Sequence, residues 1–120
     1  MSYIRIILAF VVVAVSSAQV PSSSDDQAVD YARRLAARQK TAVPTSGFVP
    51  DSDTAVAIAT AVLVPIYGKS IAASEKPWHA GLKGGVWTVV GTFNGKGNGG
   101  EGIVQIDKRT GAIIFVTHTM

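Results

Sequence analysis

Residues 50–68 read PDSDTAVAIATAVLVPIYG, and this stretch decides the fold of the chain. Its acidic start, Asp51 to Asp53, supplies the side-chain oxygens and negative charge that favour a helix N-terminus. Apolar residues then recur at spacings of three and four, which is typical of a helix with one buried stripe: Ala55, Ile58, Ala59, Val62, Leu63 and Ile66. Pro65 disturbs the last turn, and Gly68 gives the backbone the freedom to leave it. The pattern predicts a helix that begins after Pro50 and ends before Gly68.

Four strands are predicted after this helix. Residues 69–76 form either a short second helix or an irregular crossover. β-branched and aromatic residues then gather in four ranges, 78–82, 86–93, 102–107 and 112–117. Turns and a glycine-rich loop separate these ranges, at residues 83–85, 94–100 and 108–111. Because short connections join antiparallel neighbours, the sequence predicts the α+β class, an antiparallel meander with the helix laid across one face.

The N-terminus is predicted to be a secretory signal peptide over residues 1–18. An apolar run follows the single basic residue Arg5, and Ser16-Ser17-Ala18 places small residues before a cut between Ala18 and Gln19. The run is too short to span a bilayer comfortably, and an uncleaved N-terminal anchor is the alternative. The mature chain is therefore expected to be periplasmic or secreted, with no membrane span after cleavage.

Residues 19–46 are predicted to be a tether with a weak amphipathic helix, ahead of a folded domain at residues 47–120. Residues 19–27 contain little that can be buried. From Asp26 onward, apolar residues recur at helical spacing: Ala28, Tyr31, Ala32, Leu35 and Ala36. This segment is either a docked helix or a marginal one on a linker. Pro44 then breaks the pattern.

Composition confines the chain to one small domain and removes several classes of function. It has 120 residues, 48% of them hydrophobic, and no cysteine. Disulfides, thiolate zinc sites, iron–sulfur clusters and cysteine nucleophiles are therefore excluded, and two histidines make a poor metal cage. The formal net charge is +3, which falls to +2 when residues 1–18 and their Arg5 are removed. A nearly balanced surface gives no electrostatic reason to expect nucleic acid as a partner.

The sequence shows no motif for catalysis or a cofactor. Residues 95–100, GKGNGG, satisfy the dinucleotide pattern G-x-G-x-x-G, but no helix follows to hold a pyrophosphate, so a hairpin loop is the better interpretation. His79 and His118 lie far apart without a recognisable acid or nucleophile spacing. The strands offer only Glu101 and the turn-proximal Asp107 as acids. We therefore expect no enzyme, no cofactor and no metal.

Both faces of the predicted sheet carry apolar residues, although one helix can cover only one of them. Trp87, Val89 and Phe93 alternate with Val86 and Val90. The second face requires cover from the N-terminal helix, a second copy of the chain or a different protein. Interface-forming side chains on this sheet and on the glycine-rich loop give the predicted partner-binding residues: Trp87, Phe93, Asn94, Lys96, Asn98 and Gln105.

Residues 47–118 carry a series of motifs that resembles one bacterial family. These are Gly47-Phe48-Val49-Pro50-Asp51, Thr54-Ala55, Ile58-Ala59, Val64-Pro65-Ile66-Tyr67-Gly68, Gly85-Val86-Trp87, Val90-Gly91-Thr92, Ile106-Asp107-Lys108 and Thr110-Gly111. The chain resembles the immunity proteins of the nuclear transport factor two fold, found in polymorphic toxin systems. The resemblance implies a cone-like α+β domain with a curved sheet, which binds and neutralises a cognate toxin. It supplies no catalytic residues.

Three functional hypotheses follow. The first is a secreted, non-enzymatic immunity protein whose partner is a cognate toxin or another envelope protein. The second is a cone-fold domain that binds a small apolar ligand or acts as an enzyme, with Tyr67, Trp87 and Gln105 lining a cavity. The third is a periplasmic homodimer without a ligand. A cavity with convergent polar groups favours the second hypothesis, whereas a dimeric mass with both sheet faces covered favours the third.

Overall fold

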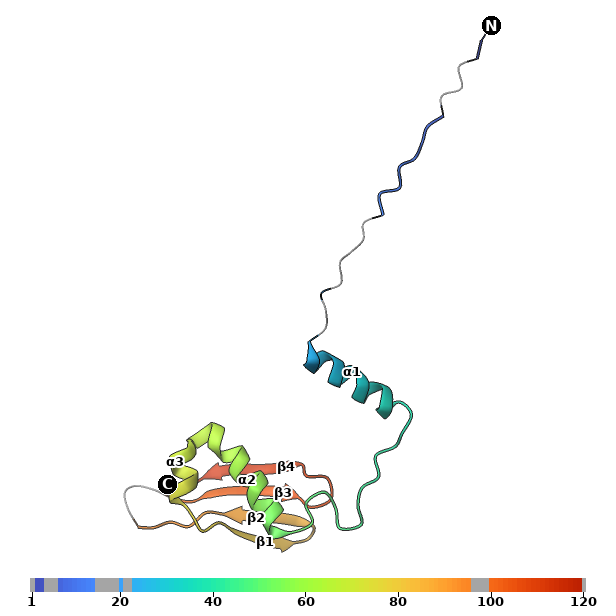
Figure 1. Cartoon of the computed structure of the whole chain (residues 1–120). Coiled ribbons are helices and arrows are strands. Elements are labelled where there is room, and N and C mark those ends of the chain that lie inside the picture. Colours follow the sequence, from blue (N-terminus) through green and yellow to red (C-terminus); the bar gives the residue numbers. More distant parts are fainter. Residues whose placement is uncertain (1, 4–6, 15–19, 21–22, 96–99, 120) are drawn as a thin grey trace. The chain divides into compact units, whose positions relative to one another are not determined.

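A computed structural model describes residues 2–3, 7–14, 20, 23–95 and 100–119, and its contacts divide the chain into a unit of residues 1–40 and a unit of residues 41–120 (Figure 1). The first unit contains helix α1, Ser24–Ala36. The Ser23 hydroxyl accepts a hydrogen bond from the Asp26 N–H (3.1 Å), and the Asp26 carboxylate accepts one from the Ser23 N–H (3.2 Å). This capping box starts the helix two residues before the predicted position, because Asp26 is its third residue and Ser23 its cap.

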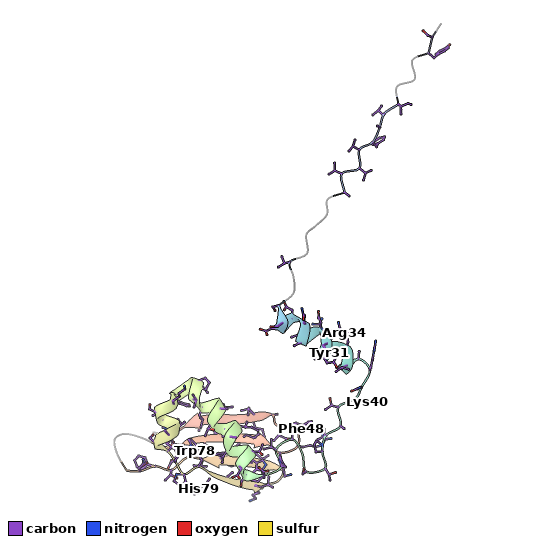
Figure 2. All side chains as sticks on the ribbon, viewed as in Figure 1. Tyr31, Arg34, Lys40, Phe48, Trp78 and His79 are labelled. Atoms are coloured by element: carbon purple, nitrogen blue, oxygen red, sulfur yellow. The ribbon has the colours of Figure 1, made fainter. Side chains whose placement is uncertain are left out.

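Helix α1 has an apolar side but buries none of its residues. Figure 2 shows Tyr31 and Arg34 projecting from it. The boundary of the second unit, at Thr41, lies a few residues before the predicted domain start at Gly47. Among the described residues no helix has the length and apolar content needed to cross a bilayer. The predicted cleavage site, Ala18–Gln19, lies outside the described residues.

Helix α2, Ser52–Tyr67, is the helix that the opening stretch predicts. Asp51 caps it, since its Oδ1 accepts hydrogen bonds from the Thr54 N–H (2.8 Å) and the Thr54 hydroxyl (2.6 Å). The side that faces the sheet is lined by small residues, Ala55 and Ala59, together with Leu63, and all three are buried. Small side chains let the helix axis approach the sheet closely. The predicted stripe ends early, because Ile66 is 57% exposed.

Helix α2 is followed at once by a short helix, α3, Lys69–Ser74, which the sequence left as one of two possibilities. Gly68 separates the two helices with φ +94°, a value that a residue with a Cβ rarely adopts. The chain then passes Glu75 and Trp78 and enters the sheet. The Trp78 indole donates a hydrogen bond to the Ala72 carbonyl (3.0 Å), so this connection is fastened to α3 (Figure 2).

The sheet contains β1, His79–Lys83, β2, Val86–Val90, β3, Gly102–Asp107, and β4, Ile113–His118, in the order β1-β2-β3-β4. All neighbours are antiparallel, as the short connections predict. Strand β2 ends three residues before the predicted limit of Phe93. The Gly91 N–H still bonds the Gly102 carbonyl, but the Thr92 N–H turns to the Glu75 carbonyl (2.7 Å). The chain leaves the ladder there to meet the end of α3.

One face of the sheet forms the core with α2 (Figure 1). Its buried members from the strands are Trp87, Val89, Val104 and Ile106. Val49, ahead of α2, is fully buried among them, and its N–H donates to the Lys108 carbonyl (3.0 Å). The predicted α+β class with a four-stranded antiparallel meander is therefore confirmed, and the sheet is not closed.

Acid is expected to weaken the start of α2. The two hydrogen bonds from Thr54, the side-chain bond first, lower the pKa of Asp51 below its ordinary value of 3.8. Stability from a lowered carboxyl pKa is present above the unfolded value and is lost as the pH falls through the folded value. Asn caps a helix about as well but does not titrate. Asp51→Asn should therefore leave the Tm at pH 7 within about 2 °C of the wild type and lessen its fall between about pH 5 and pH 2.

Thermal unfolding followed by circular dichroism at a series of pH values measures this effect. Part of the acid loss remains in the variant, because hydrogen bonds from Thr110 and Arg109 also lower the pKa of Asp107. An Asp51→Asn curve parallel to the wild-type curve contradicts the capping argument.

Candidate functional site

The sheet register defines the side chains that share the face turned away from α2. Residues directly opposite each other in antiparallel strands lie on the same face. Three rows cross this side: His79–Val90–Ile103–Thr117, Gly81–Thr88–Gln105–Phe115 and Lys83–Val86–Asp107. We call these rows the open face, because the helices described in residues 41–120 lie on the other side (Figure 1).

The open face mixes polar and apolar side chains. The Gln105 amide donates a hydrogen bond to the Thr88 hydroxyl (3.2 Å) across the β2–β3 pair. Phe115 lies opposite Gln105 on edge strand β4 and is 49% exposed. Val90 and Ile103 form an adjoining pair that is only half-buried. Aromatic residues are enriched at protein interfaces, so Phe115 makes this face the candidate binding surface.

Trp87, which was predicted from the sequence to lie on the partner surface, lies in the core of the structure. Its side chain is 8% exposed and lies on the α2 side, directly opposite Ile106. Its indole N–H donates to the Val49 carbonyl (2.8 Å), a bond that satisfies the buried polar end of the ring. Trp87 and Gln105 therefore point to opposite faces of the sheet and do not form one surface.

The other predicted partner residues also separate. Phe93 and Asn94 lie just beyond β2, where Phe93 is 43% exposed and the Asn94 amide donates to the Ser74 carbonyl (2.7 Å). Gln105 lies on the open face, as described above. Lys96 and Asn98 lie outside the described residues. The structure thus brings Phe93 and Asn94 together with α3, not with Gln105.

A pocket of about 240 Å³ lies beside α3, and we call it the α3 pocket. Ile71, Glu75, Phe93, Asn94 and His118 are among its lining residues. Glu75, which follows α3 directly, is only 4% exposed. One carboxylate oxygen, Oε1, accepts a hydrogen bond from the Gly102 N–H (2.5 Å). The other, Oε2, lies 3.3 Å from His118 Nε2, at ion-pair distance, but the two atoms do not meet hydrogen-bond geometry.

Gly91, just after β2, leaves room for this carboxylate, and Gly102, at the start of β3, leaves room for the Trp78 ring. A Cβ on Gly91 would lie 2.8 Å from Glu75 Oε1 and 2.9 Å from the Trp78 ring. A Cβ on Gly102 would lie 3.2 Å from the same ring. On the outer side the Tyr67 ring meets the His118 ring at 5.2 Å between centroids, tilted by 44°. The Glu75–His118 pair is thus enclosed by α2, α3 and the sheet.

Sequence reasoning missed this pair. Glu75 stands in a connection whose structure was left open, and His118 stands in the last strand, so no short spacing joins them. The one available signal was indirect. Glycines occupy residues 91 and 102, inside or directly beside predicted strands, which indicates a close approach of some other group to the sheet.

The chemistry open to the α3 pocket is limited by its groups. A carboxylate beside an imidazole can hold a cation or move a proton, but a metal ion normally needs more ligands. Within the described part of the chain no three His, Cys, Asp or Glu side chains come together. The Asp107 carboxylate lies at the other end of the sheet. It accepts hydrogen bonds from Thr110 and so stabilises the turn before β4.

The fold is a small α+β domain with a single sheet, one face of which is covered by helix while the other is exposed. Residues 54–120 match the family model of the NTF2 fold immunity proteins, and the chain belongs to this family. This confirms the resemblance seen in the sequence. Membership supports a role in neutralising a toxin and favours a non-enzymatic function. No curated protein and no solved structure matches the chain.

Proposed function

We propose that this protein is exported and neutralises one cognate toxin by binding it with the open face. The observation that carries this proposal is a sheet face with an exposed aromatic residue, Phe115, and a fixed polar pair, Gln105 and Thr88, over which no helix described in residues 41–120 lies. Family membership supplies the kind of partner. The exposure of Phe115 on this face supports the choice of binding surface.

Inhibition occurs by occlusion in this proposal. The open face is built from four hydrogen-bonded strands. This surface is therefore already folded before the toxin binds. The protein then blocks either the active site of the toxin or its path to a target. No catalytic group is needed on the immunity protein.

Export places the encounter in the periplasm. The support is the sequence of residues 1–18, with its apolar run and its small residues before Gln19. A toxin met there acts on an envelope target or crosses the periplasm on its way to the cell interior. Residues 19–46 then form an N-terminal tether ahead of the binding domain.

The partner is to be identified by cross-linking residues 19–120 in the periplasm of the host and recovering the complex for mass spectrometry. The proposal expects one stoichiometric protein whose expression alone stops growth and whose toxicity is removed by co-expression of this chain. Recovery of the chain alone, in cells that carry an active toxin, contradicts it.

Once the toxin has been identified, the Phe115→Glu variant tests whether the open face binds it. A charge introduced within a buried interface should weaken toxin binding by about 100-fold or more and abolish protection in a growth assay. Ile66→Glu is the matched control, since it places the same charge on an exposed apolar residue of α2, 57% exposed and on the helix layer. Unaltered protection by a folded Phe115→Glu variant, or equal loss in both variants, removes the open face from the proposal.

A further inference from the structure

Glu75 carries a buried oxygen that the described residues leave without a hydrogen-bond donor. Its Oε1 is satisfied by the Gly102 N–H, but Oε2 is buried and accepts no hydrogen bond. Buried carboxylate oxygens are nearly always paired, because desolvating an ionised group without a donor is strongly unfavourable. The nearest candidate, His118 Nε2 at 3.3 Å, is not oriented to bond it. A donor from outside the chain would complete this group.

The α3 pocket gives such a donor a space beside Glu75. Its wall includes the apolar side chains of Ile71 and Phe93, and Asn94 adds an amide at the rim. Asn94 is held there by its bond to the Ser74 carbonyl. At about 240 Å³ the space is smaller than the usual site for a drug-sized molecule, so its occupant is a small group.

The charges select the chemistry of that group. An anion would face the Glu75 carboxylate, and a bare divalent cation would find one carboxylate where it needs several ligands. An ammonium group meets both conditions, because it carries a positive charge and three hydrogen-bond donors. An alkyl stem behind it would lie against Ile71 and Phe93, as lysine stems lie on apolar surface elsewhere.

We propose that the α3 pocket binds a primary ammonium group on a short alkyl stem, with Glu75 as its counter-ion and Ile71 and Phe93 against the stem. The ammonium is carried either by a free amine or by a lysine side chain of a protein partner. Because Glu75 Oε2 has almost no contact with solvent, the proposal requires the neighbouring His118 ring to move aside when the ammonium binds. The pocket lies on the helix side of the sheet, so this site is separate from the open face.

The test is a titration of the purified protein with n-butylammonium, followed by the NMR signals of the His118 ring. We expect a saturable shift at His118, no comparable shift at the exposed His79, and no saturable shift with 1-butanol, which has the same stem without the charge. N-acetyl-lysine amide, compared with N-acetyl-norleucine amide, distinguishes the two sources. Binding of the lysine derivative about tenfold tighter than butylammonium identifies a protein side chain, and equal or weaker binding identifies a free amine. Absence of saturation with every amine, or equal binding of butanol, overturns the proposal.

Two pairs of variants locate the site. Glu75→Gln should weaken butylammonium binding by at least about tenfold, whereas Glu101→Gln, a nearby carboxylate held by the Thr119 hydroxyl (3.0 Å), should leave it unchanged. Ile71→Lys places a tethered ammonium one helical turn before Glu75, and it should block added amine, whereas Ile71→Met should not. If Glu75→Gln fails to fold, the Ile71 pair decides, and undiminished amine binding to Ile71→Lys overturns the proposal. Neither outcome depends on the toxin, so failure here leaves the proposed immunity function standing.

Discussion

Replacing Trp87 by alanine is expected to lower the free energy of unfolding by about 4 kcal/mol. The ring is 8% exposed in the core beside Val89, Val104 and Ile106, and its removal leaves a large cavity between sheet and helix. The Val49 carbonyl also loses the indole donor that lies 2.8 Å from it. Domains of this size are stable by only about 5–15 kcal/mol, so the variant should be partly unfolded or close to it.

Urea unfolding followed by far-ultraviolet circular dichroism measures the loss, since tryptophan fluorescence itself changes in this variant. Trp87→Phe is the control, because it keeps an aromatic ring and removes the N–H, and it should cost about 1–3 kcal/mol. Equal midpoints for wild type and Trp87→Ala would show that Trp87 does not belong to the core. Loss of toxin binding in a Trp87 variant reports unfolding, not an interface.

The elements of the fold were predictable because their signals are local. The spacing of apolar residues and the cap at Asp51 place α2, and the observed helix Ser52–Tyr67 agrees with them. Glycine-containing turns separate the strands, and β3 has the predicted bounds, Gly102–Asp107. The errors at the ends of β2 and α1 have a common cause. Each boundary is set by a hydrogen bond, Thr92 to Glu75 or Asp26 to Ser23, that the apolar pattern does not encode.

The face of the sheet on which each strand residue lies was less predictable. Alternation correctly separates Trp87 and Val89 from Val86 and Val90, but it does not say which set meets the helix. Only the tertiary structure shows that Trp87 faces α2 and that Gln105, with Thr88, faces away. The predicted partner residues therefore mixed side chains from the core, the open face and the rim of the α3 pocket.

The Glu75–His118 pair was not predictable from spacing, because its two members meet only when β4 pairs with β3 and its end comes to lie beside α3. Its enclosure depends on three features of different origin, namely the helix end at Ser74, the glycine at residue 91 and the last residue of β4. Long-range pairs of this kind are where local reasoning from sequence ends. They are also where a buried charge gives the clearest reason to look for a ligand.

Gly47→Ala is expected to be the second strongly destabilising change, by about 3 kcal/mol or more. Gly47 has φ +79°, and a Cβ built on it would lie 2.3 Å from the Lys108 carbonyl oxygen and 2.9 Å from the Arg109 Cα. Both contacts are backbone atoms, which cannot rotate away. The segment after Gly47 is bound to this turn, because the Phe48 and Val49 N–H groups donate to the Arg109 and Lys108 carbonyls (3.0 Å each). The clash therefore separates two paired pieces of backbone.

The Gly84→Ala variant separates the cost of backbone strain at a positive φ from the cost of the steric clash at Gly47. Gly84 also has a positive φ, +57°, but no atom lies within 4 Å of its built Cβ, so alanine there should lower the unfolding free energy by only about 1 kcal/mol. Urea unfolding of both variants gives the difference, which measures the collision alone. Because Val49 holds the Trp87 indole, Gly47→Ala and Trp87→Phe should also fail to add in a double-mutant cycle. Equal effects of the two glycine substitutions would mean that the segment ahead of α2 is not fastened to the β3–β4 turn, and the core would then have to be closed by α2 alone.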